Sequence, residues 1–404
     1  MAGILIIGGG ILQIPALKRA RELGYETYLT DRSRSCAARP YADYFFEIDI
    51  NNFSESASIA TELAKQGKIS GVYTQGTDAE YTVACAASAA GLFGIDPSVA
   101  RTCKNKVLMR EALRNGGVED TPFQAALTYE DCVSAAEILG FPLYIKPSDN
   151  SASRGITRVS NLADLEEAYM NARGSLLTES QVLLETEMIG TEHSVDTVIY
   201  DGVLYPAGIS DRIFLEKDVF AVQTESVTPS TLPAKIQENM YQKMKEAAKA
   251  IGVNYGAFKG DLIVDALGNV RIIEVTARTS GGFDSQYRKP LSFGIDILKA
   301  TIEIAMGRPL DPLDLIPKFV MQSKTYSLMP QPGVVESVIG LDEAKNIPGV
   351  HDIIVTCKEG DVIDEYRDCS IRTNFITISA PTTKELQKIQ NLVAETFIIK
   401  TTRS

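Results

Sequence analysis

The sequence predicts a protein of mixed α/β and α+β class in three parts, and three observations support this. The chain has 404 residues, more than one hydrophobic core usually covers. Its first quarter alternates short apolar runs with helical stretches, the pattern of a parallel α/β unit. Beyond it strand pairs dominate, and a proline-rich acidic stretch at 309–317 marks a boundary. We therefore expect parts at 1–97, 98–308 and 309–404.

The composition disfavours several kinds of partner. Hydrophobic residues make up 45% and charged residues 23% of the chain, as in an ordinary globular protein. The formal net charge of −12 disfavours general binding to nucleic acid or to anionic lipid. The N-terminal apolar stretch has no basic region or A-x-A cleavage site and is too short to span a bilayer. We expect a cytoplasmic protein that binds neither nucleic acid nor a membrane.

The cysteines and histidines restrict the chemistry. Six cysteines are scattered without a C-x-x-C pair, so buried reduced thiols are expected rather than a metal or redox site. His193 and His351 are the only histidines, which disfavours His-cluster metal sites and most His-based triads. Catalysis must therefore depend on carboxylates, lysine, arginine and backbone amides.

The N-terminal part begins with a Rossmann-like β–α–β unit. An apolar run at 3–7 ends in Gly8-Gly9-Gly10, as a buried parallel strand does when it enters a tight turn. A helix and a second strand follow, and the strand ends at Asp31, at a distance that suits a ribose. The dinucleotide fingerprint, however, needs a third glycine where this chain has Gln13. A structural or substrate-lining role is therefore preferred over nicotinamide binding.

Two more strands are expected in this unit, at 44–48 and 71–75, with helices at 56–66 and 79–91. Asp78 follows the last of these strands, at the edge where open α/β sheets bind ligands. Capping of the next helix is an equal alternative for the same side chain.

The middle part presents two lysines beside a polar loop. Lys106 lies at the start of a helix that ends near Gly116, and Lys146 lies on an apolar strand at 142–147. Between this strand and a returning strand at 156–159 runs a small polar loop, whose backbone N–H groups can close over phosphates. The loop is not a Walker A motif, because G-x-x-x-x-G-K-[ST] is absent.

Two glutamates belong to the next strand, linker and strand. Glu185 ends an apolar run, and a carboxylate in such a place needs a partner. Adenine recognition by the linker, with Glu192 accepting from ribose hydroxyls, is one explanation. Surface salt bridges of little consequence are the other.

A β-hairpin with a carboxylate on each strand follows. Asp261 lies on the first strand and Glu274 on the second. Facing carboxylates repel each other unless a cation lies between them. Oxygen ligands without histidine suit Mg²⁺, which also takes oxygens from substrate phosphates. Arg278 can bind an anion carried by that metal, and the glycine-rich turn at 279–284 offers a site for a carboxylate or phosphate.

In their order and spacing, these residues resemble the ATP-grasp superfamily over nearly the whole chain. The opening G-G-G-x-L-Q is similar to the preceding domain of carbamoyl-phosphate-synthase-like ligases. The stretch E-V-T-A-R-T-S-G-G is similar to the E-V-N-x-R-x-S-G-G of bacterial L-amino acid ligases and related carboxylate–amine ligases. The resemblance implies a Rossmann-like pre-ATP-grasp domain, an ATP-grasp domain with a lid at about 122–188 and a central antiparallel sheet, and a small C-terminal α+β module.

The resemblance also implies a role for each residue. The ATP-binding residues would be Lys106, Lys146, Ser153, Gly155, Glu185, Thr186, Met188 and Glu192. Asp261 and Glu274 would hold Mg²⁺, with Mn²⁺ as an alternative, and Lys146 and Arg278 would be catalytic. The substrate would contact Arg212, Arg278, Ser280, Gly281 and Gly282.

Two of these positions carry an open question. A surface salt bridge is an equal alternative for Arg212. The family usually has Asn where this chain has Thr276, and a hydroxyl is a poorer Mg²⁺ ligand than an amide carbonyl. The second metal position is therefore in doubt.

The last hundred residues predict a small α+β module. Strands are expected at 333–340, 353–356 and 372–379, and a final helix starts at the capping box Thr382-x-x-Glu385. The module has no obvious catalytic residue. We expect it to close the active site from one side or to form a dimer contact.

The functional hypothesis is an ATP-dependent carboxylate–amine ligase that forms an amide or peptide-type bond through an acyl phosphate. One substrate is expected to be an amino acid, and the protein is expected to be a homodimer. Within the ligases, phosphoribosylglycinamide synthetase or carbamoyl-phosphate-synthase-like activity is the alternative. Outside them, the alternatives are a nicotinamide-dependent oxidoreductase and a non-catalytic nucleotide-binding regulator.

Overall fold

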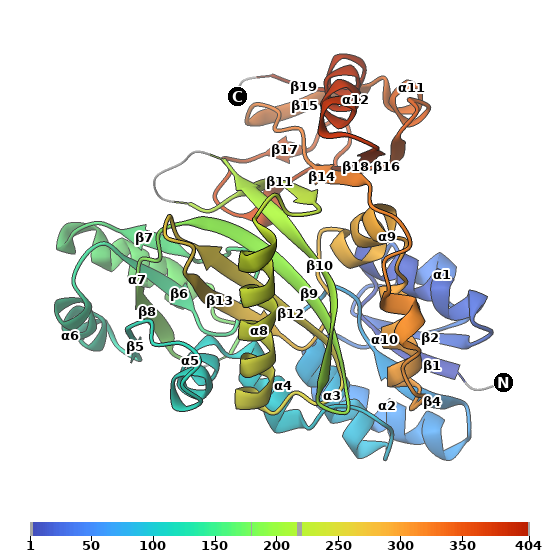
Figure 1. The fold of residues 1–404 in the computed structure, drawn as a ribbon, viewed down its shortest axis with the longest axis horizontal. Helices are drawn as coiled ribbons and strands as arrows, with labels where there is room; N and C mark the ends of the chain where they lie inside the picture. The colour runs from blue at the N-terminus through green and yellow to red at the C-terminus, as the bar shows by residue number, and fades with distance from the viewer. Residues whose placement is uncertain (1–2, 179, 216–219, 403–404) are drawn as a thin grey trace.

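A computed structural model of the chain describes residues 3–178, 180–215 and 220–402 (Figure 1). An N-terminal α/β unit, a lid and a C-terminal module surround a large central sheet (Figure 1). The mixed α/β and α+β class predicted from the sequence is confirmed. No helix in the described ranges is long and apolar enough to cross a membrane.

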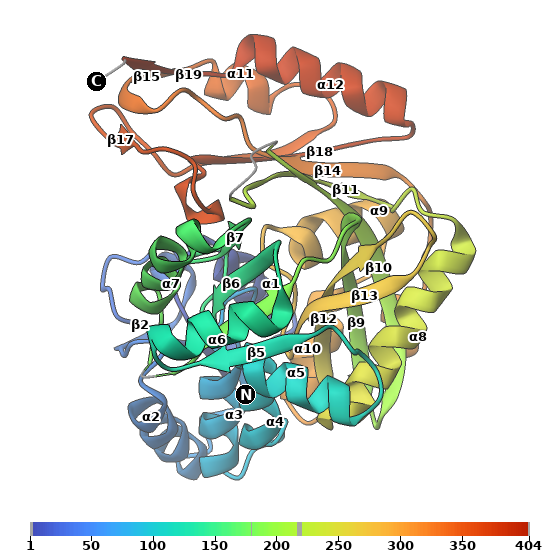
Figure 2. The ribbon, with the colours of Figure 1, turned by 90° about the vertical axis from the view of Figure 1, so that its left-hand side faces the viewer.

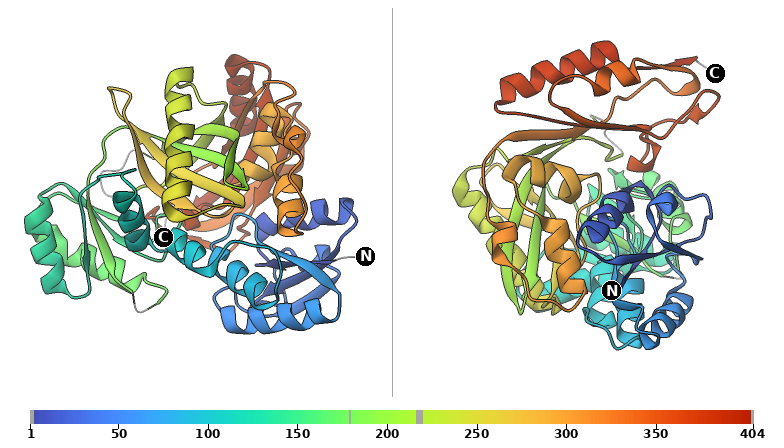
Figure 3. Two further views of the ribbon diagram at one scale, coloured as in Figure 1. Left: turned by 60° about the horizontal axis from the view of Figure 1, so that its bottom comes forward. Right: turned by 90° about the vertical axis from the view of Figure 1, so that its right-hand side faces the viewer.

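The N-terminal unit is a four-stranded parallel sheet in the order β3-β2-β1-β4. Its strands are β1 (Gly3–Ile7), β2 (Glu26–Asp31), β3 (Tyr44–Glu47) and β4 (Ile69–Tyr73), and its helices are α1 (Ile14–Glu22), α2 (Phe53–Lys65) and α3 (Glu80–Ala89). Pro15 lies in the first turn of α1, where its missing N–H leaves no hydrogen bond unmade. The later helix α10 (Ile297–Ala305) packs against this unit, with Ile302 and Met306 in the same apolar core (Figure 3).

Two helices connect this unit to the lid, the one predicted from Lys106 to near Gly116 and another before it. They are α4 (Pro97–Lys104) and α5 (Lys106–Asn115). Asn105 separates the two helices. Its side chain accepts hydrogen bonds from the backbone N–H groups of Val107 and Leu108 and so caps the start of α5. The break places Lys106 in the first turn of α5.

The lid is an antiparallel sheet in the order β5-β8-β6-β7, covered by two helices. Its strands are β5 (Phe123–Ala126), β6 (Leu143–Pro147), β7 (Thr157–Val159) and β8 (Val182–Thr186), and its helices are α6 (Tyr129–Leu139) and α7 (Leu165–Gly174). The polar loop 148–156 joins β6 to β7. It extends from the lid to the C-terminal module, where the Cys369 N–H donates to the carbonyl oxygen of Ala152 at 3.1 Å.

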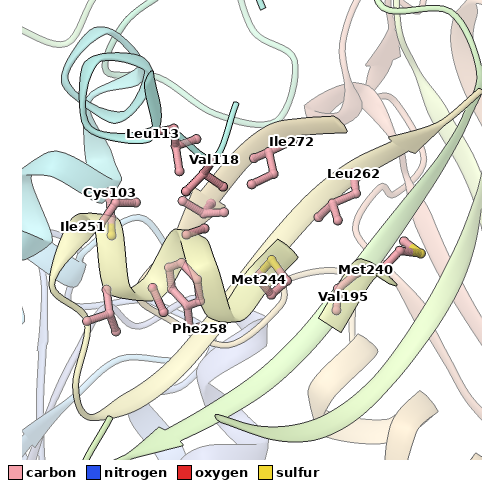
Figure 4. Close-up of a cluster of buried hydrophobic side chains, with 14 of the residues drawn as sticks. Cys103, Leu113, Val118, Val195, Met240, Met244, Ile251, Phe258, Leu262 and Ile272 are labelled. Atoms are coloured by element: carbon pink, nitrogen blue, oxygen red, sulfur yellow. The ribbon is translucent and has the colours of Figure 1, made fainter. Parts of the chain in front are cut away.

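The central sheet has eight strands, in the order β13-β12-β9-β10-β11-β14-β18-β16. These are β9 (Thr191–Tyr200), β10 (Val203–Phe214), β11 (Gln223–Thr228), β12 (Gly256–Val264), β13 (Val270–Thr276), β14 (Gln322–Tyr326), β16 (Val350–Val355) and β18 (Asn374–Ala380). Helix α8 (Ala234–Ile251) packs on one face of it. Met240, Met244 and Ile251 recur at helical spacing and meet Phe258 and Leu262 from the strands (Figure 4).

The C-terminal module contains strands of two sheets, and one of these sheets is the central sheet itself. Strand β14, which the sequence patterns did not predict, pairs with β11. Strand β18 pairs with β14, and β16 pairs with β18, so the central sheet continues into the module (Figure 2). The edge of β11 would otherwise leave a row of backbone groups unpaired. A second sheet, β15 (Gly333–Ile339), β17 (Val362–Ile363) and β19 (Ile398–Thr402), and helices α11 (Leu341–Lys345) and α12 (Thr383–Thr396) complete the module. Thr382 caps α12 as predicted.

Candidate active site

One cavity of about 390 Å³ collects nearly all of the predicted site residues. The lid, the central sheet, the N-terminal unit and the C-terminal module all contribute to its walls. The predicted residues that line it are Lys106, Lys146, Ser153, Glu185, Met188, Glu192, Arg212, Asp261, Glu274, Arg278, Ser280, Gly281 and Gly282.

Gly155 and Thr186 do not line the cavity. The backbone of Gly155 has φ +71°, and a Cβ there would lie 2.5 Å from the Cβ of Ser175. Glycine is therefore needed at this position to pack the loop against α7. The Thr186 N–H donates to the carbonyl oxygen of Pro122 at 3.1 Å, a contact that closes the lid sheet.

Glu185 forms a buried ion-pair triad with Lys146 and Arg110. Its side chain is 1% exposed and contacts Lys146 Nζ on β6, while Arg110 Nε of α5 donates to Oε2 at 2.8 Å. Burial alone would raise the pKa of Glu185, but Arg110 and Lys146 hold it below the ordinary value. The carboxylate is therefore engaged in fixing Lys146, and it is not a free acceptor for adenine. Arg110 was not among the predicted site residues, although it lies four residues after Lys106 on the same face of α5.

Asp261 and Glu274 lie opposite each other on β12 and β13, as the hairpin pattern predicted. Asp261 is 4% exposed; its Oδ2 contacts Lys259 and Arg212, while its Oδ1 is buried without a hydrogen-bond partner. Glu274 Oε2 lies 3.5 Å from Lys106 Nζ. Burial would raise the pKa of Glu274, but the surrounding cations, Lys106 first, hold it far below the ordinary value.

This donor set fits Mg²⁺. The surrounding cations keep the pKa of Glu274 low, so this carboxylate is charged, and one oxygen of Asp261 has no hydrogen-bond partner. The described part of the chain has no group of three or more His, Cys, Asp or Glu side chains that could hold a metal by themselves. Mg²⁺ is commonly bound by one or two carboxylates together with substrate phosphates and water. The Thr276 hydroxyl is buried without a partner and is not part of the cavity wall.

Lys259 is a second residue that the sequence analysis missed. It lies two residues before Asp261 on β12 and contacts its carboxylate. Residues i and i+2 of a strand share a face, so the spacing alone placed this lysine beside the metal-binding candidate.

Arg212 is not in a surface salt bridge. Its side chain is 15% exposed, and Nη1 lies 3.1 Å from both Glu192 Oε2 and Asp261 Oδ2. Burial raises the pKa of Glu192, with Arg212 opposing the shift. Arg212 therefore connects the ribose-binding candidate to the metal-binding candidate.

Asp78 orients Arg278 and does not cap a helix. Ala79 holds the capping position of α3, and no side chain caps it. Asp78 Oδ1 accepts from Arg278 Nη2 at 2.6 Å, and its Oδ2 accepts from the hydroxyl of Ser151 in the lid loop. Glu80, which is 3% exposed, lies 4.0 Å from Arg278 Nε. The N-terminal unit thus places two carboxylates around the guanidinium.

Buried polar side chains fix the glycine-rich turn at 279–284. Ser280 Oγ donates to Asp196 at 2.7 Å, and the Ser280 N–H donates to the Ser285 hydroxyl at 3.0 Å. Lys289, which is fully buried, lies 3.4 Å from Asp196 Oδ2. Gly282 has φ +60°, so the turn needs glycine there.

The glycine-rich start of the chain is closed by its own side chains. Asp31 Oδ2 accepts from the Gly9 N–H and its Oδ1 from the Ser33 N–H, both at 2.8 Å. A Cβ at Gly9 would lie 2.5 Å from Cys36 Sγ. The Asp31 carboxylate is therefore engaged in holding the turn, in line with the preference for a structural role over nicotinamide binding.

The cavity is richer in positive charge than the chain as a whole. Its basic residues, Lys106, Lys146, Arg212, Lys259, Arg278, Arg288 and Arg372, outnumber its acidic ones, Asp78, Glu185, Glu192, Asp261, Glu274 and Asp284, by seven to six, in a chain of net charge −12. A polyanionic ligand that brings a divalent cation suits such a site.

Comparison with known proteins agrees with this chemistry. An ATP-grasp domain model matches residues 139–286, and the model of L-amino acid ligase C-terminal domain 2 matches residues 326–401. The L-arginine-specific L-amino acid ligase of Bacillus subtilis is 22% identical over 378 residues, covering 92% of this chain and 90% of that protein.

Two solved structures share the fold. An L-amino acid ligase from Bacillus licheniformis matches with a TM-score of 0.86 and 21% identity, over 100% of this chain and 99% of that one. A phosphoribosylglycinamide synthetase from Anaerococcus prevotii matches with a TM-score of 0.75 and 19% identity, over 99% and 100% of the chains.

The chain contains an ATP-grasp domain and resembles ATP-dependent ligases that form a carbon–nitrogen bond. Within that class, its ATP-grasp domain is followed by the C-terminal domain of the L-amino acid ligases. ATP and Mg²⁺ are the cofactors of the family.

Proposed function

We propose that the protein joins the carboxylate of one small molecule to the amine of another, with an amino acid as at least one substrate. The observation that carries this proposal is the placement of Arg278. It follows the strand of Glu274, precedes the Gly281–Gly282 turn and lines the same cavity as Lys106 and Lys146. The similarity to the arginine-specific L-amino acid ligase supports the amino-acid substrate.

The residues divide the work by charge. When bound, Mg·ATP supplies the phosphoryl group that converts the substrate carboxylate into an acyl phosphate, which the amine then attacks to release phosphate. Lys106 and Lys146 neutralise phosphate oxygens, and Asp261 and Glu274 hold Mg²⁺. Arg278 stabilises the negative charge that develops on the carbonyl oxygen, while the Gly281–Gly282 turn receives the substrate carboxylate.

The remaining ATP contacts are proposed on the family resemblance. The lid loop with Ser153 and Gly155 closes over the phosphates. Glu185, Thr186 and Met188 are proposed to hold adenine, and Glu192 to accept from the ribose. Of these four residues all but Thr186 line the cavity. Glu185 acts through Lys146 in this proposal, because its carboxylate is engaged by two cations.

We further propose the division into 1–97, 98–308 with a lid at about 122–188, and 309–404, a cytoplasmic location, and use of Mn²⁺ in place of Mg²⁺. All six cysteines are free thiols, which suits a reducing compartment.

A homodimer is proposed on the exposed apolar side chains of Leu313, Ile316, Phe319 and Val320. Light scattering of the purified chain measures that state directly.

The decisive experiment is phosphate release from Mg·ATP with pairs of amino acids and small carboxylates. We expect pair-dependent release that falls at least a hundredfold in Arg278→Ala and Glu274→Ala. Arg271→Ala is the matched control, since Arg271 is exposed on the same strand as Glu274. Full activity in the first two variants would overturn the assigned roles. Phosphate release above background only with phosphoribosylamine and glycine, or with bicarbonate and an ammonia source, would favour the alternative ligases. No release with any pair would favour the regulator.

A further inference from the structure

The C-terminal module contributes a cation to the cavity that the proposed chemistry does not use. Arg372 precedes β18 and lines the cavity beside Phe375. Its Nε donates to the carbonyl oxygen of Cys369 at 3.0 Å, and its Nη1 donates to that of Gln223 at 3.3 Å. The guanidinium carbon lies 4.9 Å from the centre of the Phe375 ring. These contacts fix the guanidinium without neutralising its charge.

Arg372 differs in this respect from the other six basic residues of the cavity. Each of those lies within 4.0 Å of a carboxylate oxygen: Lys106 of Glu274, Lys146 of Glu185, Arg212 and Lys259 of Asp261, Arg278 of Asp78, and Arg288 of Asp284. Among the described residues, no carboxylate lies within that distance of Arg372. Burial and the nearby Arg212 lower the pKa of Arg372. An uncompensated charge in such a place favours binding of an anion.

A second, independent observation lies on β11. Ser226 stands opposite Arg212 on β10 and opposite Thr325 on β14, so the three side chains share one face of the sheet. Ser226 lines the cavity and is 3% exposed, and its hydroxyl has no hydrogen-bond partner. A buried hydroxyl normally has a hydrogen-bond partner, so the Ser226 hydroxyl is free to form a hydrogen bond with a ligand atom. Arg372 also contacts β11, through the Gln223 carbonyl.

We propose that Arg372 and Ser226 form a subsite for an anionic group, a carboxylate or a phosphate, carried by a substrate other than ATP. The inference rests on the proposed function, in which Lys106, Lys146 and the metal-binding hairpin already serve the ATP phosphates. A neutral substrate of the same shape leaves the guanidinium without a counter-charge. The C-terminal module therefore selects acidic over neutral substrates.

The test compares acidic amino acids with their neutral isosteres in the phosphate-release assay. The pairs are aspartate with asparagine, glutamate with glutamine, and O-phosphoserine with serine, each offered with the same panel of partners. The variants are Arg372→Gln, Arg372→Lys and Ser226→Ala. Arg367→Gln is the control, because Arg367 is 67% exposed and precedes the same strand. Thermal unfolding of each variant checks that it folds.

We expect the wild type to use one acidic amino acid at least tenfold better than its isostere. In Arg372→Gln the KM of that acid rises about tenfold to a hundredfold, as for loss of a charged hydrogen bond, while the KM of the isostere and of ATP stay unchanged. Arg372→Lys retains part of the preference. Which acid is preferred separates a carboxylate ligand from a phosphate ligand.

Two results would overturn the inference: a wild type that does not discriminate, or an Arg372→Gln variant whose losses are equal for the acid, its isostere and ATP. Thermal shifts with the same compounds in Mg·ADP keep this inference separable from the ligase proposal. An acid-specific shift that is lost in Arg372→Gln supports the subsite even if no pair is ligated. Ligation without any acid preference supports the ligase and removes the subsite.

Discussion

Arg278 Nη2 and Asp78 Oδ1 lie 2.6 Å apart and connect the segment after the β12–β13 hairpin to the N-terminal unit. The same carboxylate also accepts from Ser151 of the lid loop. Three parts of the fold therefore meet at one side chain. Burial would raise the pKa of Asp78, but Arg278 and the Ser151 hydroxyl hold it below the ordinary value.

The first prediction concerns this contact. Asp78→Asn keeps the shape but removes the charge that orients Arg278, so kcat/KM should fall about tenfold to a hundredfold. Asp78→Asn combined with Arg278→Ala should be no worse than Arg278→Ala alone, because residues that act as a unit are not additive. Steady-state phosphate release measures both, with the exposed Asp342→Asn as control. Additive losses would show that Asp78 acts independently of Arg278.

The second prediction concerns the triad of Lys146, Glu185 and Arg110. Glu185→Gln leaves two buried cations without their counter-charge, so the free energy of unfolding should fall by about 3 kcal/mol. Urea denaturation measures the change. Glu238→Gln, which loses only an exposed pair with Lys235, should leave stability as it is. Equal stability of the two variants would mean that the triad contributes little.

The third prediction concerns Thr276. Its buried hydroxyl has no partner, so Thr276→Val should leave the unfolding free energy equal or slightly higher. The Mg²⁺ concentration for half-maximal activity should also stay the same, because the hydroxyl does not line the cavity. A Mg²⁺ titration checks this, and a several-fold higher requirement would make Thr276 a metal ligand.

The fourth prediction concerns acid stability. Burial opposes ionisation of Asp211, but hydrogen bonds from His193, Ser230 and Thr231 lower its pKa from 3.8 to about 2. A carboxyl group with a lowered pKa in the folded state contributes stability that is complete above pH 3.8 and is lost as the pH falls towards 2. Asp211→Asn should therefore lower the unfolding free energy by about 2 kcal/mol at neutral pH and less at pH 3. A constant difference between pH 7 and pH 3 would contradict this assignment.

Local patterns located those cavity residues that lie on helices and strands, such as Lys106, Lys146 and Asp261, because these elements have a fixed periodicity. The hairpin that carries Asp261 and Glu274 has a loop-type turn between two apolar strands, and such a pattern determines its own pairing. Arg110 and Lys259 were within reach of the same reasoning, since helix and strand spacing place them beside Lys106 and Asp261.

Long-range pairing explains what the sequence patterns missed. Asp78 meets Arg278 across 200 positions of the chain, and Arg372 reaches β11 across 149. No periodicity within one segment encodes such a contact. The joining of β14 to β11 was missed for the same reason: the choice of strand partner depends on which edge is left open by the rest of the fold.

The continuous sheet has a consequence for anyone who wishes to exchange the C-terminal module. If the chain is cut before β14, the backbone N–H and C=O groups of β11 from Glu225 to Thr228 lose their partners. Such an unpaired edge strand can pair with other chains and promote aggregation. A module taken from another protein must therefore contain a strand that pairs with β11 in the same register as β14 does. A chimera that keeps the recipient's own β14 and exchanges only the segment around Arg372 leaves the pairing of β11 with β14 intact, and under the proposed subsite this exchange changes the substrate preference.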